Sequence, residues 1–203
     1  RIPGAVVARG IVGPYAHAEE DSGLFFLGND RIAYRLTDVA PARISTDAIE
    51  ATWDGYAIVS DCLCFTYSFA GHKYITFHFE TAGATWEYDI ATGLWHERES
   101  HDAGLAPIGR WRGNCSVAAF GKNLIGDWAS GQIGYLSTTT FTEFGNQIIA
   151  SVTSPPIHGG GARVFFGSLE LEMETGAGLT TGQGSDPQVM LDMSDDGGRT
   201  WSP

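Results

Sequence analysis

The feature that most constrains this chain is an Asp-box, the motif Ser-x-Asp-x-Gly-x-Thr-Trp, close to its last residue. An Asp-box is a β-hairpin turn. Its aspartate carboxylate can accept backbone N–H groups across the turn, and its glycine can adopt the positive φ that a tight turn requires. The residues that define the motif are Ser194, Asp196, Gly198, Thr200 and Trp201. The sequence therefore predicts a hairpin on which the indole of Trp201 packs.

Short apolar strands separated by turns rich in glycine and aspartate recur along the chain. This pattern is typical of antiparallel β structure, and no stretch predicts a helix. The predicted strand pairs are 24–27 with 32–36, 74–79 with 84–89, and 123–127 with 132–136. We therefore expect an all-β chain.

Three tyrosines, Tyr34, Tyr88 and Tyr135, occur in a shared context and are spaced by 54 and 47 residues. A four-stranded propeller blade has a period of about 40–50 residues, so the spacing favours a β-propeller over an unrelated sandwich. Asp-boxes also recur in propeller blades. We expect a partial propeller of three to four blades, each a four-stranded antiparallel sheet. The approximate blades are 15–60, 61–110, 111–150 and 151–203. Because little chain follows Trp201, we expect this to be part of a longer protein.

The formal net charge of −12 limits the classes of partner. Non-specific binding to nucleic acid or to an anionic membrane requires a basic surface, so neither is expected. The three cysteines, Cys62, Cys64 and Cys115, have no disulfide-framework or metal-site spacing. Cys62 and Cys64 are two apart in a strand-like run and should share one face as small buried side chains. We expect reduced thiols, no metal and no cofactor.

Residues 169–174 alternate strictly between apolar and acidic side chains. Strand geometry predicts that Leu169, Leu171 and Met173 face a core while the glutamates line the opposite face. The acidic residues of this strip are Glu170, Glu172 and Glu174. A solvated strand face is one interpretation, and a strip that lines a lumen or a subunit interface is the other.

An enzyme is the alternative to a scaffold, and a sialidase-like glycosidase is its specific form. Arg1-Ile2-Pro3 resembles the tripeptide that precedes Asp-boxes in sialidases, but only one Asp-box is present. Glu87 and Tyr88 are adjacent in a strand and should point to opposite faces, so they do not form the required pair. A glycan-binding propeller stays open as well. Its stacking platform would come from Trp86, Trp95, Trp111, Trp128 and Trp201. No catalytic residue is predicted.

Several runs together carry a more specific resemblance. They are 27–36, 41–50, 85–98, 169–176, 182–188 and the Asp-box. In this order they resemble the tail-hub proteins of short-tailed bacteriophages, also called packaged-DNA-stabilisation or tail accessory proteins.

The resemblance implies a non-enzymatic virion component built around a β-propeller. Members assemble in the host cytoplasm as a homo-oligomeric ring, a hexamer, beneath the portal and its adaptor. They close the head after DNA packaging and provide attachment for the tail needle and the tailspikes. A stand-alone interaction propeller of other origin is a third reading of the residues.

Overall fold

The computed structural model describes residues 9–157, 159–160, 163–172, 181 and 189–202. The chain divides into two units, residues 1–148 and 149–203, which are described separately. The elements of the first unit are β1 (His17–Glu20), β2 (Gly23–Leu27), β3 (Ala33–Leu36), β4 (Pro41–Arg43), α1 (Asp47–Asp54), β5 (Leu63–Phe69), β6 (His72–Phe79), β7 (Ala84–Asp89), β8 (Trp95–Glu97), β9 (Glu99–His101), β10 (Pro107–Arg110), β11 (Gly113–Ala119), β12 (Lys122–Asp127), β13 (Ile133–Tyr135), β14 (Thr142–Glu143) and β15 (Asn146–Gln147). The predicted all-β class is confirmed.

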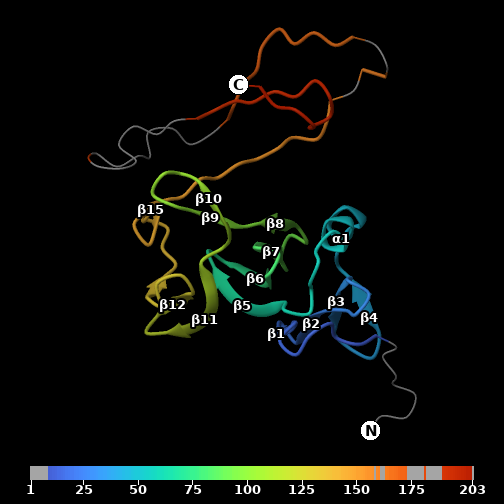
Figure 1. Ribbon diagram of the computed structural model, residues 1–203, viewed down its shortest axis with the longest axis vertical. Coiled ribbons are helices and arrows are strands. Elements are labelled where there is room, and N and C mark those ends of the chain that lie inside the picture. Colours follow the sequence, from blue (N-terminus) through green and yellow to red (C-terminus); the bar gives the residue numbers. More distant parts are fainter. Residues whose placement is uncertain (1–8, 158, 161–162, 173–180, 182–188, 203) are drawn as a thin grey trace. The chain divides into compact units, whose positions relative to one another are not determined.

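Three antiparallel sheets form the body of this unit, and neighbours along the chain are neighbours in each sheet. The first sheet has the order β1-β2-β3-β4, the second β5-β6-β7-β8 and the third β11-β12-β13. The first strands of successive sheets lie side by side, β1 next to β5 and β5 next to β11 (Figure 1). Two-stranded ladders, β9 with β10 and β14 with β15, complete the unit. This arrangement of successive sheets is that of a partial propeller, as expected.

The first two strands of each sheet are joined by a two-residue turn with positive φ at its first residue. These first residues are Asp21 (φ 50°), Ala70 (φ 52°) and Phe120 (φ 54°). Such turns follow the twist of the paired strands and favour small or polar residues. The turns recur after 49 and 50 residues, so the three sheets can be aligned residue by residue. In that alignment Phe26, Ile75 and Ile125 are equivalent, and all three are buried.

The larger core lies between the first and second sheets and is closed by α1. Its fully buried side chains include Phe25, Leu27, Trp53, Phe77 and Phe79. The sequence predicted no helix, and this prediction was wrong. Thr46 caps α1 by accepting the backbone N–H of Ile49, and acidic residues occupy the first turn. Since Ile49 and Trp53 are four residues apart, both face the core, and this burial stabilises a helix of only eight residues.

The second core, between the second and third sheets, is smaller. Its buried apolar side chains are Tyr67, Trp111 and Ile125. The ring of Phe65 stacks on Trp111 with 6.0 Å between the ring centroids. Buried polar side chains also lie at this interface, and they form the candidate site.

The third sheet packs one face against the second sheet, and its other face is exposed within the first unit. Val117, Leu124 and Tyr135 form one cross-strand row on it. Val117 and Tyr135 are each more than half exposed, as is Ile133. On the second sheet, the equivalent face is covered by the third sheet, since Val117 aligns with the buried Tyr67.

In the second unit, one antiparallel bridge joins Met193 to Ser202 among the residues that the structure describes. The predicted strand at 169–174 is not present over 169–172, where the backbone forms no ladder. Leu169 and Leu171 are 71% and 62% exposed, so the expected buried apolar face was predicted wrongly. An alternating pattern forms a strand only when another strand supplies hydrogen bonds to its edges.

Candidate functional site

The Asp-box residues lie in one turn of the second unit. The Asp196 carboxylate accepts the backbone N–H groups of Arg199 and Thr200 at 2.8 and 2.9 Å, and the Thr200 hydroxyl at 2.7 Å. These hydrogen bonds, with that of the Thr200 backbone the strongest, lower the pKa of Asp196 to about 2. Ser194 Oγ accepts the N–H of Gly198, whose φ is 89°.

The indole of Trp201 donates from Nε1 to the Gly198 carbonyl at 3.1 Å and closes the turn, although half of the side chain stays exposed. Both carboxylate oxygens of Asp196 accept hydrogen bonds from within the turn. A structural role for the motif stays a prediction that this geometry supports.

The acidic strip is described only in part. Glu170 and Glu172 are exposed, and Glu174 lies outside the described residues. Arg1-Ile2-Pro3 of the sialidase comparison also lies outside them. Cys62 is buried and Cys64 is half-buried, with 3.9 Å between their sulfur atoms, and both are free thiols.

A cluster that the sequence did not reveal lies between the second and third sheets, and we call it the polar interface. Its residues are Tyr67, His78, Glu87, Arg98, Trp111, Arg112, Asp127 and Glu143. They come from β5, β6, β7, β12, β14 and the segments beside β8 and β11. Side chains far apart in the chain therefore meet at one interface.

At the second sheet, Tyr67 donates its hydroxyl to Glu87 Oε1 at 2.5 Å, and Arg98 donates to the Tyr67 oxygen at 2.6 Å. The Arg98 guanidinium also stacks over the Trp111 ring, 3.9 Å from its centroid. Tyr67 and Glu87 are buried. Burial is the main cause that raises the pKa of Tyr67 far above its ordinary value, so the phenol stays protonated.

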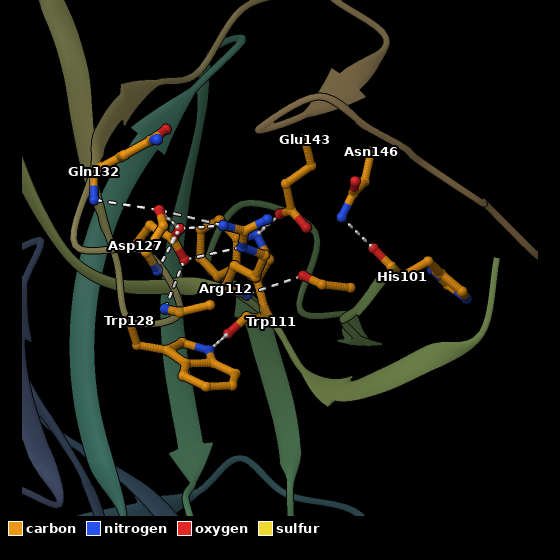
Figure 2. Close-up of polar contacts among 11 residues, drawn as sticks. His101, Trp111, Arg112, Asp127, Trp128, Gln132, Glu143 and Asn146 are labelled. Atoms are coloured by element: carbon orange, nitrogen blue, oxygen red, sulfur yellow. Dashed lines mark hydrogen bonds and ion pairs between the residues drawn. The ribbon is translucent and has the colours of Figure 1, made fainter. Parts of the chain in front are cut away.

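At the third sheet, Arg112 and Asp127 form a buried ion pair, shown in Figure 2. Arg112 Nε donates to Asp127 Oδ1 at 3.0 Å and Nη2 donates to Oδ2. Burial alone would raise the pKa of Asp127, but hydrogen bonds from Arg112, Ser130 and the Ala129 backbone lower it to about 2. The pair is therefore ionised at neutral pH.

Trp111 lies between the group around Tyr67 and the Arg112–Asp127 ion pair. Its indole Nε1 donates to Glu143 at 2.7 Å, and its carbonyl accepts from Trp128 Nε1 at 3.0 Å. Nearby, Asn146 donates to the carbonyl of His101 at 3.0 Å, which attaches β15 to β9 (Figure 2). Asp127 of β12 and Glu143 of β14 thus bind Arg112 and Trp111, and the Trp111 backbone is in turn bonded to Thr85 of the second sheet.

The hydrogen bonds and ion pairs of this cluster join side chains from separate elements. A tyrosine with a carboxylate and an arginine resembles a glycosidase dyad in its residue types. However, Tyr67 and Glu87 are only 5% and 3% exposed, so a substrate does not reach them. Three of the tryptophans in the glycan alternative are engaged in packing. Trp86 and Trp95 pack against the larger core, and Trp111 is buried in the smaller one.

One local signal could have indicated part of the interface. The segments 89–93 and 127–131 share the pattern Asp-x-Ala-(Thr/Ser)-Gly. In both, the aspartate accepts the N–H of the alanine and the hydroxyl of the next residue, and the glycine has positive φ. In both, the same aspartate also binds a basic partner, His72 for Asp89 and Arg112 for Asp127.

No cluster of three or more histidine, cysteine, aspartate or glutamate side chains with the geometry of a metal site occurs in the part of the chain that the structure describes. Within that part, α1 is too short to cross a membrane, and no other helix is present that could do so.

The comparisons with known proteins agree with this description. A family model described as "Bacteriophage P22 Gp10, beta-propeller" matches residues 1–141, more than two thirds of the chain. The matched segment contains α1 and all three large sheets, including the residues of the polar interface up to Asp127. A search among curated proteins finds no match.

Proposed function

This chain belongs to the family of bacteriophage P22 Gp10, the phage tail-hub structural proteins, and from that membership we propose its place in the virion. It closes the portal channel after DNA packaging and connects the portal and its adaptor to the tail needle and the tailspikes. The observation that carries this proposal is the family match over all three sheets. The absence of catalysis is part of the proposal, and the burial of Tyr67 and Glu87 supports it.

The proposal includes a homo-oligomeric ring, a hexamer, assembled in the host cytoplasm. It also includes the four-blade division 15–60, 61–110, 111–150 and 151–203. Rings of this kind need rigid subunits with broad faces that can be buried. The exposed apolar side chains on the third sheet, among them Val117 and Ile133, supply such a face.

We further propose that Glu170, Glu172 and Glu174 line a lumen or a subunit boundary. The exposure of Glu170 and Glu172 and the net charge of −12 support an acidic surface along which DNA slides without adhering. In the assembled ring, carboxylates that lie on the outer surface away from every neighbour would contradict this placement.

The experiment is an amber codon at Trp53 in the phage genome that encodes the chain. Trp53 is chosen because every residue of the second and third sheets follows it. In a non-suppressing host, heads are expected to fill with DNA and then lose it, measured as DNase-sensitive DNA, and the particles should lack needle and tailspikes. Growth in a host that suppresses the codon with tryptophan is the control. Heads that retain their DNA without suppression would refute the closing role.

A further inference from the structure

The two interfaces between the large sheets differ in chemistry. The interface between the first and second sheets is closed by apolar side chains from both sheets and from α1. The polar interface holds only three buried apolar residues but several ionisable groups. Burying a charge is costly unless it is paired, so a change of protonation affects the second contact far more than the first.

His78 is the ionisable group of the polar interface that is fully buried and has no charged partner. It lies on β6 and is 0% exposed. The Trp111 backbone N–H donates to Thr85 Oγ1 at 3.0 Å, and Thr85 Oγ1 lies 2.7 Å from His78 Nδ1. The neutral ring of His78 is therefore hydrogen-bonded at Nδ1 to a hydroxyl that can serve as donor or acceptor.

The surroundings of His78 oppose a second proton. Within the described residues, Nε2 has no hydrogen-bond partner. From β5, the edge-on ring of Phe65 covers it, and from β10 the nearest charge is the cation Arg110. The charges of Glu80 and Asp61 act on Arg110. On the rest of the interface, Glu87 is paired with Arg98 and Asp127 with Arg112. Burial, and then the charge of Arg110, lower the pKa of His78 to about 4.

We propose that the polar interface is an acid-sensitive joint, in which protonation of His78 releases the third sheet from the second while the first and second sheets stay packed. A second proton places a positive charge on a fully buried ring whose hydrogen-bond partner within the described residues is the neutral Thr85 hydroxyl. The added charge lies beside Arg110 in a site without water access. Release follows because the open form hydrates the imidazolium.

The direction of the pH effect follows from the two protonation states. The folded pKa of His78 lies below the ordinary 6.5, so the neutral ring stabilises the closed interface fully above pH 6.5. This contribution is lost as the pH falls from 6.5 to about 4. At pH 5 the closed-to-open ratio is expected to be about 30-fold smaller than at pH 7.5. Asp127, with a pKa of about 2, stays ionised over this range.

Hydrogen exchange on the whole chain at pH 7.5 and pH 5, corrected for the intrinsic rates, tests the joint. Protection of the amides in β11 and β12 should fall about 30-fold, while amides of β2 paired within the first sheet should change little. In His78→Gln the fall should disappear, and in His17→Gln, an exposed histidine on β1, it should persist. An equal loss of protection in both sheets, or a persistent fall in His78→Gln, would overturn the proposal.

A second measurement on the unchanged chain keeps the test decisive where His78→Gln does not fold. Imidazole NMR signals can be followed from pH 8 to pH 4 with the other histidines as references. His78 should stay neutral at pH 5 while the third sheet is closed. A His78 signal that titrates near 6.5 in the folded chain would overturn the proposal.

Discussion

Asp127 binds both the backbone of its own turn and a buried arginine. It anchors the turn 127–131 through the Ala129 N–H and the Ser130 hydroxyl, and it neutralises the buried Arg112. Removing one partner of a buried pair leaves the other charge unpaired. We expect Asp127→Asn to lower the free energy of unfolding by about 3–5 kcal/mol, measured by urea denaturation at pH 7.

The matched variant is Asp89→Asn. It changes the same turn in the second sheet, where the partner is the partly exposed His72, and should cost only about 1 kcal/mol. The folded pKa of Asp127 is depressed from 3.8 to about 2, so its ionised form stabilises the fold above pH 3.8 and this contribution is lost as the pH falls to 2. The difference in free energy of unfolding between wild type and Asp127→Asn should therefore become smaller over that range. A difference that is constant down to pH 2 would contradict the ion-pair explanation.

The residues of the polar interface could not be predicted from the sequence because they interact over long separations. Tyr67 and Glu87 are 20 residues apart, and Trp111 and Glu143 are 32 apart. Each is an ordinary strand or turn residue in its local context. The Asp-box was found because its hydrogen bonds are all local, within four residues of Ser194 or Asp196.

Among the elements, the sheets were predictable and their alignment was only partly so. Tyr34 and Tyr88 are indeed equivalent, since each pairs with an equivalent buried residue, Phe26 and Ile75. Tyr135 is displaced by one residue: it pairs with Leu124, and Gly134 occupies the equivalent position. A shift of one residue turns a side chain to the other face, so Tyr135 is exposed. The hairpin turns give the more regular period because each joins the first two strands of its sheet.

Helix α1 was missed because its signal is short. Only the cap Thr46, two acidic residues and the pair Ile49 and Trp53 mark it. We expect Thr46→Ala to lower the free energy of unfolding by about 1 kcal/mol, because the Ile49 N–H loses its acceptor. Thr46→Ser should restore most of it. Urea denaturation monitored by tryptophan fluorescence is the measurement, and equal stabilities of the alanine and serine variants would argue against the cap.

Phe120 is the unusual residue among the three hairpin turns. It is 93% exposed and has φ 54°, a conformation that costs a bulky L-residue about 1–2 kcal/mol. We expect Phe120→Asn, which creates an Asn-Gly turn, to raise the free energy of unfolding by about 1 kcal/mol. Ala70→Asn at the equivalent position of the second sheet is the comparison. If Phe120→Asn destabilises the isolated chain, the ring of Phe120 makes a stabilising contact that its exposure does not suggest.

At the scale of the whole molecule, the sequence predicted the class, the antiparallel sheets and the family, and the family match over residues 1–141 confirms the last. These features depend on repeated local patterns, which a single sequence displays. The division into a larger apolar core and a smaller polar interface depends on which sheet faces pair in space. Trp53 packs in the larger core and Trp111 in the smaller one, and the residues beside each do not indicate which sheets it packs between.

The net charge of the whole chain leads to a last prediction about DNA. With 12 basic and 24 acidic residues, the chain repels the phosphate backbone, and exposed cations such as Arg43 are paired with carboxylates while Lys122 lies over the ring of Tyr135. Non-specific DNA-binding proteins show dissociation constants of about 10⁻⁴–10⁻⁶ M at physiological salt and bind more tightly as salt is lowered. We therefore expect no change in the fluorescence anisotropy of a labelled 30-base-pair duplex with the chain at about 100 µM in 50 mM salt.

A variant in which Glu19, Asp21 and Asp38 are changed to lysine should begin to bind, because it places new cations around the exposed turns of the first sheet. Salt-dependent binding by the unchanged chain would show that a local basic surface outweighs the net charge. It would contradict the proposal that DNA slides along this protein without adhering.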